Sequence, residues 1–310
     1  DFIRLQGAVP AIQLGHAGRK ASCHTAVEDW RPLRDEDAAD GMPPWQGIAP
    51  SDLPEPKSRF LPKELDHDDI MAVLEAFRVA TLRSADAGYD IVEVHGAHGY
   101  LIHQFLSPIS NQRTDGYGGD IEGRMRFALE VAEVVRDAWP ADKPVFYRIS
   151  AVDGEGGEWN LDHSVLLSQA LKERDIDLID VSSGGISGKT DMPKIPRIPA
   201  YQAAFASRIR EQADIMTIAV GGITEAAQAE RILQDGDADM VALARELLWN
   251  ADWPAHAAQA LGIKDPFGVQ PHEYAFRLRQ REAQKLMEIN QGGAKTAAAL
   301  AYFLDDEQTD

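Results

Sequence analysis

The stretch DIVEVHGAHGYLIHQFLSPISNQRTDGYGG, from Asp90 to Gly119, decides the fold and the function of this chain. It begins with a predicted strand, 91–94, in which three of the four residues are β-branched. The strand pattern breaks at Gly96, and His95, His98 and Tyr100 occur within six residues. Because glycine lets the backbone turn there, the three side chains could all aim at one point.

Two imidazoles and a phenol at the end of a strand are side chains suited to catalysis. Imidazole N–H groups can hold a carbonyl oxygen while negative charge develops on it, and a neighbouring phenol can donate a proton. Packed or solvated histidines are the ordinary alternative, although they are less common where two histidines and a tyrosine meet at a glycine. A zinc site is a second alternative, but no third ligand follows at a recognisable spacing.

Composition narrows the class of protein. The 310 residues are 44% hydrophobic and 26% charged, as in a globular protein with one large domain or two small ones. A net charge of −19 argues against nucleic acid and anionic membranes as partners. The single cysteine, Cys23, cannot form an internal disulfide, and we find neither a signal peptide nor a membrane-spanning apolar run. These features predict a cytoplasmic location and a small-molecule substrate.

Strand-like apolar runs alternate with helical patterns along the chain. Strands are predicted at 9–14, 91–94, 145–149, 178–181, 216–220 and 240–244, and helices at 68–87, 122–139, 161–174, 201–212 and 224–234. This alternation predicts a parallel sheet covered by helices, either a (β/α)₈ barrel or an open doubly wound sheet. The open dinucleotide-binding fold should carry G-x-G-x-x-G after its first strand, and this chain does not. The long segment 15–65, with Trp30 and Trp45, is expected to be a lid or binding loop.

The last two predicted strands end in groups that suit a phosphate. Gly221 and Gly222 follow strand 216–220, and Ala244 and Arg245 end strand 240–244. Many (β/α)₈ enzymes bind phosphate after their seventh and eighth strands, through backbone N–H groups and a cation. An ordinary tight turn is the alternative for the two glycines alone. If these are strands seven and eight, the first two strands are missing from this chain, so we expect a partial barrel over 1–265 and a helical extension over 266–310.

Three segments together resemble one family: AIQLGHAGRK (11–20), VEVHGAHGYLIHQFLSPISNQRTDGYGG (92–119) and IAVGGIT (218–224). They resemble the Old Yellow Enzyme family, and the similarity extends roughly from Val9 to Leu261. The long second segment is far more specific than any single short motif. The resemblance implies a (β/α)₈ barrel that binds FMN and takes hydride from NADPH or NADH, with a possible homo-oligomeric assembly.

The resemblance also implies a role for each matched residue. Gln13 would hydrogen-bond the pyrimidine edge of the flavin, and Arg148 would lie near flavin N1 and O2. A structural salt bridge is the alternative for Arg148, because a buried guanidinium needs a partner. The residues that would hold the FMN phosphate are Gly221, Gly222, Ala244 and Arg245.

The implied reaction is the reduction of an activated C=C bond in an α,β-unsaturated carbonyl compound. His95 and His98 would polarise the carbonyl group, and Tyr100 would protonate the α-carbon. One alternative is a non-catalytic barrel fragment or interaction module that has lost flavin binding. Another is a flavin-free barrel enzyme for a phosphorylated metabolite, but it leaves Gln13 and Arg148 unexplained.

Overall fold

The computed structural model describes residues 1–56, 60–153, 159–186 and 198–290. Contacts divide the chain into two compact units, one formed by Val9–Arg245 and the other by Asp1–Ala8 together with the chain from Glu246 onward. The boundary after residue 265, expected from the sequence, stays a prediction.

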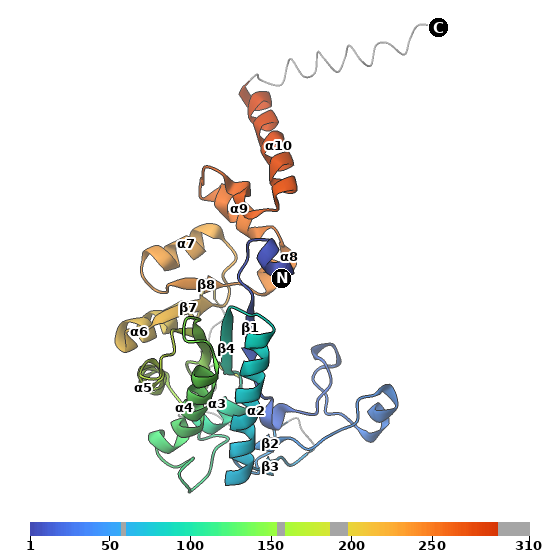
Figure 1. Cartoon of the computed structure of the whole chain (residues 1–310), viewed down its shortest axis with the longest axis vertical. Coiled ribbons are helices and arrows are strands. Elements are labelled where there is room, and N and C mark those ends of the chain that lie inside the picture. Colours follow the sequence, from blue (N-terminus) through green and yellow to red (C-terminus); the bar gives the residue numbers. More distant parts are fainter. Residues whose placement is uncertain (57–59, 154–158, 187–197, 291–310) are drawn as a thin grey trace. The chain divides into compact units, whose positions relative to one another are not determined.

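The larger unit is built on a parallel sheet of six strands (Figure 1). The strands are β1 (Ala11–Leu14), β4 (Ile91–Gly96), β5 (Val145–Ser150), β6 (Leu178–Ser182), β7 (Met216–Val220) and β8 (Met240–Ala242). They are hydrogen-bonded in that order, so each strand pairs with the one before it in this series. Among the described residues, β1 and β8 are the two edges of the sheet and do not pair with each other. The parallel α/β sheet is therefore confirmed, in the form of six strands that do not close on themselves.

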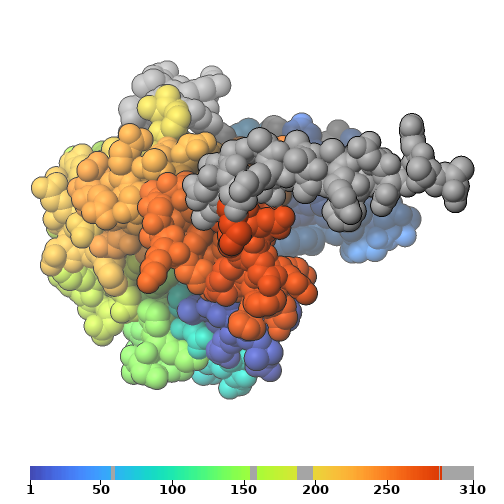
Figure 2. All heavy atoms as spheres, turned by 90° about the horizontal axis from the view of Figure 1, so that it is seen from above, coloured from blue at the N-terminus to red at the C-terminus, as the bar shows by residue number. Residues whose placement is uncertain are grey.

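Helices connect consecutive strands and form a continuous layer. They are α2 (His67–Asp86), α4 (Ile121–Ala138), α5 (Leu161–Lys172), α6 (Ala203–Ala213) and α7 (Ala226–Gln234), with the short α3 (Leu101–Leu106) after β4. Contacts join α2 to α4, α4 to α5 and α5 to α6. Seen from above, the colours of this unit run from cyan through green and yellow to orange along an arc (Figure 2). Consecutive strand–helix units therefore lie side by side around a curled sheet.

Local sequence explains where these helices begin. The carboxylates of Asp66 and Asp120 and the amide oxygen of Asn160 accept hydrogen bonds from backbone N–H groups in the first turns of α2, α4 and α5. Such N-caps satisfy donors that have no partner within the helix. The helix predicted at 224–234 begins at Ala226, with Glu225 as its N-cap residue.

Alternation along the strands separates the core from the polar face of the sheet. Tyr147 donates a hydrogen bond of 3.0 Å to the carbonyl oxygen of Ala128 in α4, so it points into the helix layer. Val145 and Ile149, two residues to either side, are fully buried with it. Burying one such apolar side chain contributes about 1.5–3 kcal/mol to the stability of the folded state. Because strand side chains alternate, Arg148 points to the opposite face.

The segment between β1 and α2 has little regular structure. Its described residues form three short 3₁₀ turns and a two-stranded sheet, namely η1 (Gly18–Lys20), η2 (Ala26–Glu28), η3 (Asp35–Asp40), β2 (Ile48–Ala49) and β3 (Lys63–Glu64). Arg31 and Asp37 join two of its parts through hydrogen bonds of 2.8 and 2.7 Å. Both oxygens of the carboxylate take part, which fixes the geometry of the pair.

The second unit is helical. Its elements are α1 (Phe2–Leu5), most of α8 (Arg245–Trp249), α9 (Trp253–Ala260), η4 (Pro266–Val269) and α10 (His272–Asn290). Arg279 of α10 bonds the carboxylate of Asp265 at 2.7 Å, next to η4. Across both units, none of the helices that the structure describes is long and apolar enough to cross a membrane.

Candidate active site

The three predicted catalytic side chains lie together where β4 ends. The ring centroids of His95 and His98 are 5.1 Å apart, and those of His95 and Tyr100 are 5.3 Å apart. His95 is buried, with 8% of its surface exposed, whereas His98 and Tyr100 are partly exposed. The polar constellation expected from the sequence is therefore present as a cluster of three rings.

A strained turn brings these rings together. His98 and Gly99 both adopt left-handed backbone conformations, with φ angles of +57° and +71°. A Cβ atom on Gly99 would lie 2.2 Å from the carbonyl oxygen of Gly185, so only glycine fits there. The backbone N–H of Tyr100 then bonds the carbonyl oxygen of Ala97 at 3.1 Å and closes the turn.

Two serines from neighbouring strand ends hold His98. Nε2 of His98 lies 2.7 Å from Oγ of Ser182, the last residue of β6. The backbone N–H of His98 donates to Oγ of Ser150, the last residue of β5, at 3.0 Å. Neither serine could be recognised from the sequence, because a single serine at a strand end carries no specific signal.

Both imidazoles are neutral at pH 7. Burial, reinforced by the charge of Arg148, lowers the pKa of His95 to about 4 and that of His98 to about 3. A neutral imidazole has one N–H donor and one acceptor. Nδ1 of His95 is buried and has no hydrogen-bond partner among the described residues. A buried polar atom without a partner is a place where a ligand can gain a hydrogen bond.

A row of polar side chains crosses the same face of the sheet. Gln13 lies opposite Glu93 on β1 and β4, and its amide donates to the Glu93 carboxylate. Gly15 lies two residues further along, and a Cβ atom there would make a tight contact of 3.1 Å with Cβ of His95. Burial, with a contribution from the nearby charge of Asp180, raises the pKa of Glu93 to about 7. This carboxyl group therefore titrates near neutrality.

Arg148 already has a partner within the protein. It lies opposite His95 on one side and Asp180 on the other, and its Nε is 3.3 Å from Oδ2 of Asp180. Burial raises the pKa of Asp180, while the charge of Arg148 opposes that rise. A buried guanidinium needs a partner, and a structural salt bridge was the alternative to a flavin contact for Arg148. The structure supplies a carboxylate, so the need for a counter-ion by itself does not argue for the cofactor.

The predicted phosphate residues follow two neighbouring strands. Gly221 and Gly222 come directly after β7, with φ angles of +107° and +68°. Val220 of β7 pairs with Ala242 of β8, and the exposed residues Ala244 and Arg245 follow. The glycine conformations suit a tight turn as well as an anion-binding loop. Their adjacency at one edge of the sheet is the arrangement that a phosphate site needs.

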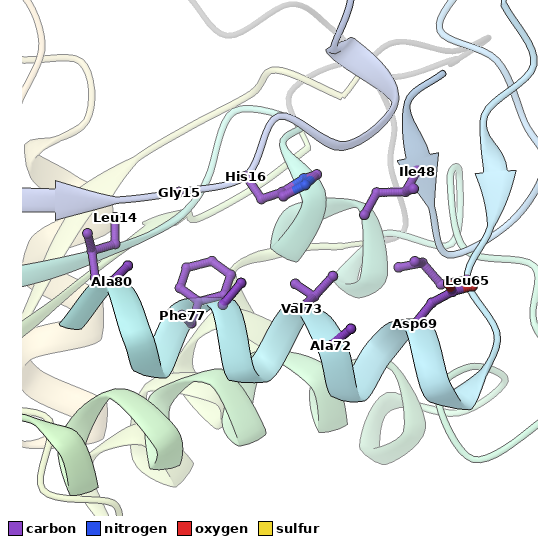
Figure 3. Close-up of a pocket in the computed structure, with 11 residues that line it drawn as sticks. Leu14, Gly15, His16, Ile48, Leu65, Asp69, Ala72, Val73, Phe77 and Ala80 are labelled. Atoms are coloured by element: carbon purple, nitrogen blue, oxygen red, sulfur yellow. The ribbon is translucent and has the colours of Figure 1, made fainter. Parts of the chain in front are cut away.

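The described part of the larger unit includes a small apolar pocket and a larger one beside the ring cluster. One, of about 370 Å³, is an apolar hollow between the end of β1 and α2, where Leu14, Val73 and Phe77 face a common space (Figure 3). It includes none of the predicted site residues. The other, of about 700 Å³, is lined by His98 and Tyr100. A pocket of that size can hold a small organic substrate.

The segment 15–65 supplies most of the lining of the larger pocket. Its two half-exposed tryptophans, Trp30 and Trp45, lie in the pocket wall with Lys20. The Lys20 ammonium lies 5.7 Å from the centre of the Tyr100 ring and donates to the carbonyl oxygen of His98 at 2.8 Å. The predicted binding loop thus borders the cluster of three rings. Throughout the described ranges, no three His, Cys, Asp or Glu side chains are arranged to hold a metal ion.

Comparison with known proteins gives consistent matches. NADPH dehydrogenase from Geobacillus sp. (strain WCH70) is 44% identical over 270 residues, which cover 87% of this chain and 72% of that protein. Among solved structures, morphinone reductase superposes with a TM-score of 0.63 at 27% identity and covers 83% of this chain and 67% of that one. Histamine dehydrogenase from Rhizobium sp. 4-9 superposes with a TM-score of 0.65 at 26% identity. The match covers 82% of this chain but only 35% of the histamine dehydrogenase chain.

The resemblance to the Old Yellow Enzyme family is confirmed by these matches. FMN is the cofactor of this group of oxidoreductases, and a nicotinamide nucleotide is the hydride donor. A family model described as NADH:flavin oxidoreductase / NADH oxidase matches residues 1–263, and the chain therefore belongs to that family.

Proposed function

We propose that this protein is an FMN-dependent NAD(P)H:enone oxidoreductase, which reduces the activated C=C bond of α,β-unsaturated carbonyl compounds. The observation that supports this most directly is the cluster of two neutral imidazoles and a phenol beside the larger pocket. A non-catalytic module is not favoured, since the family match includes the whole cluster. A cytoplasmic location and a homo-oligomer stay predictions.

The residues present suit a bound FMN. Gln13 offers an amide and Arg148 a guanidinium with five N–H donors, of which Nε faces Asp180. The residues for the phosphate are Gly221, Gly222, Ala244 and Arg245. The buried atoms without partners include Nδ1 of His95, next to this row. When bound, the flavin supplies hydride transfer, first from the nicotinamide and then to the β-carbon of the substrate.

The two histidines hold the substrate carbonyl group in this proposal. Each is a neutral imidazole, and an N–H from His95 and one from His98 would donate to the carbonyl oxygen. Such donors stabilise the negative charge that develops on the oxygen while the β-carbon gains hydride. Because the rings are held by burial and by Ser182, they need little reorganisation.

Tyr100 completes the reaction by donating its phenolic proton to the α-carbon. Its ring lies 5.3 Å from that of His95, and Tyr100 lines the larger pocket together with His98. The ammonium of Lys20 lies 5.7 Å from the centre of the same ring. Proton donation by a positioned side chain typically contributes about 10²–10⁴-fold to a rate.

We also propose that the complete fold is a (β/α)₈ barrel and that two strands beyond the six seen here close it. Both edges of the described sheet, β1 and β8, have one unpaired side. The apolar hollow on α2 lies at the β1 edge and includes Leu14 and Phe77. Two further strand–helix units would pair with both edges and cover this hollow, which removes exposed edges.

The test separates the two halves of the reaction. The purified protein should show flavin absorbance, bleach anaerobically with NADPH, and recover its colour when 2-cyclohexenone is added. Replacing Tyr100→Phe should slow the recovery about 100-fold or more and leave the bleaching unchanged. A protein that stays colourless after FMN reconstitution overturns the proposal. Equal loss of both steps in the variant would refute the role of Tyr100.

A further inference from the structure

A buried histidine–carboxylate pair contacts the turn that carries the ring cluster and has no role in the reaction above. His103 of α3 and Asp153, which follows β5, are 0% and 2% exposed. Nε2 of His103 is 2.9 Å from Oδ1 of Asp153. Ser107 donates to the other carboxylate oxygen at 2.8 Å. Buried titratable pairs are costly to maintain unless every group is satisfied, so this network calls for an explanation.

The hydrogen bonds define the tautomer of His103. Its Nδ1 accepts a hydrogen bond of 2.9 Å from the backbone N–H of Gly99. A backbone N–H can only donate, so Nδ1 carries the lone pair and the proton is on Nε2. That proton points at Asp153, a pure acceptor when ionised. The carboxylate therefore holds the imidazole in the one neutral form that can accept from Gly99.

Gly99 is the residue between the two groups that would act on the substrate. It joins His98 to Tyr100 in the left-handed turn, and a non-glycine residue such as His98 in that conformation costs about 1–3 kcal/mol. Both polar backbone groups of Gly99 are held by α3, because its carbonyl oxygen accepts from Nε2 of Gln104 at 2.7 Å. The His98–Gly99 peptide that carries this N–H is also held at the His98 carbonyl oxygen by Lys20. Losing the bond to His103 would therefore leave a buried N–H without its acceptor and loosen one of the two contacts that fix the peptide between the rings.

We infer that His103 and Asp153 are positioning residues that aim His98 and Tyr100 at the substrate by fixing the Gly99 peptide. The inference rests on the proposed function only for the roles of those two rings. The pair acts through Gly99, and neither member is placed to touch the substrate. Partners that orient an active group in this indirect way typically change activity about 10–100-fold when they are replaced.

Three variants test this. His103→Asn places an amide oxygen near the position of Nδ1 and keeps an acceptor for Gly99, whereas His103→Leu removes it. Asp153→Asn can turn its NH₂ group toward Nε2 and favour the opposite tautomer, in which Nδ1 would carry a proton against the Gly99 N–H. We expect a slower flavin reoxidation by 2-cyclohexenone, about 10–100-fold, in His103→Leu and Asp153→Asn. His103→Asn should recover most of the rate, and bleaching by NADPH should stay within about twofold in all three.

His163→Asn serves as the matched control, because His163 is a partly buried histidine on α5 outside the cluster. In this variant, 2-cyclohexenone should reoxidise the flavin at the wild-type rate. Equal loss of bleaching and reoxidation in the three variants, with full flavin content, would show a general packing role and overturn the inference. A wild-type rate of flavin reoxidation in His103→Leu would also overturn the inference.

A direct measurement of the tautomer does not depend on turnover or on folding of the variants. In ¹⁵N-histidine-labelled wild-type protein, the His103 ring should show a proton on Nε2 and none on Nδ1. A proton found on Nδ1 would overturn the inference even if all rates behaved as expected. Conversely, a wild-type protein that shows the Nε2 proton but does not react with enones would reject the proposed function and leave the fixed Gly99 peptide standing.

Discussion

Nε2 of His98 lies 2.7 Å from Oγ of Ser182, so the last residue of β6 orients a ring on the turn after β4. Replacing Ser182→Ala should remove this orienting contact. A typical hydrogen bond contributes about 1 kcal/mol, which corresponds to an approximately fivefold loss in kcat/KM for an enone. Steady-state kinetics with 2-cyclohexenone measures the loss, and flavin reduction by NADPH should not change.

Ser183→Ala is the matched control for this prediction. The hydroxyl of Ser183 donates to Gln202 rather than to the histidine, at 2.5 Å. The Ser183→Ala substitution therefore removes a neighbouring hydroxyl group and leaves the contact with His98 in place. A loss of the same size in both variants would mean that the strand end, and not the contact with His98, is responsible.

Glu93 should make the protein less stable at alkaline pH. Burial raises its pKa to about 7, above the usual 4.5 of an unfolded glutamate. Between these values the folded state holds a proton that the unfolded state has lost. The contribution of Glu93 to the free energy of unfolding therefore falls as pH rises from 4.5 to about 7 and levels off above that. Glu93→Gln keeps an acceptor for Gln13 and never ionises. It should be more stable than wild type by about 2 kcal/mol at pH 8.5 and by much less at pH 5.

Urea unfolding at the two pH values, at equal flavin saturation, measures this difference. Glu173→Gln on the exposed surface is a suitable control, because that residue follows α5 away from the site. A stabilisation by Glu93→Gln that is the same at both pH values would show that the carboxyl group does not titrate in this range.

The sequence predicted the repeating strand–helix pattern because that information is local. Continuous β-branched runs such as the one before His95 mark strands, and apolar residues at helical spacing mark helices. The end of the strand at Gly96 and the turn at Gly99 were also readable, because glycine at a strand end indicates a change of direction. These signals were sufficient to place His95, His98 and Tyr100 in one cluster.

Contacts that depend on the register between strands could not be read from the sequence. Asp180 reaches Arg148 because β5 and β6 are neighbours in a particular register, and no local pattern encodes that pairing. Ser182 and Asp153 lie far along the chain from the histidines that they contact. The segment 15–65 has no periodicity, so its tryptophans could be predicted to line a binding loop but not to border Tyr100.

His95 should make the protein less stable in mild acid. Its pKa of about 4 is below the 6.5 of a free histidine, because burial and the charge of Arg148 disfavour the imidazolium. As pH falls from 7 to 5, the unfolded state takes up a proton that the folded state does not, and the free energy of unfolding drops. His95 accounts for about 2 kcal/mol of this drop in the free energy of unfolding between pH 7 and pH 5. His95→Asn, which does not titrate, should lose correspondingly less stability over that interval.

The comparison requires urea unfolding curves of both proteins at pH 7 and pH 5 with the same flavin content. Glu93 changes stability in the opposite direction over part of this range, but it is present in both proteins and cancels in the difference. The same drop in wild type and variant would show that His95 is not held neutral by its surroundings.

Arg245 should contribute to FMN affinity through the phosphate alone. It follows β8, next in the sheet to the strand that ends before Gly221, and its side chain is exposed. A hydrogen bond to a charged group is worth about 1.5–3 kcal/mol, so Arg245→Gln should weaken FMN binding about 10–100-fold. Riboflavin has the same ring system without the phosphate, and its affinity should be equal in both proteins. Flavin fluorescence during titration of the flavin-free protein measures both ligands.

Arg231→Gln provides the matched control, since it removes an exposed guanidinium from α7 outside the phosphate loops. It should leave the affinity for FMN unchanged, apart from a weak effect that salt screens. A loss of riboflavin affinity in Arg245→Gln as large as the loss of FMN affinity would mean that the substitution disturbs the loop after β8. Unchanged FMN affinity would place the phosphate elsewhere, because a cation in contact with a dianionic group cannot be removed without a measurable loss of binding.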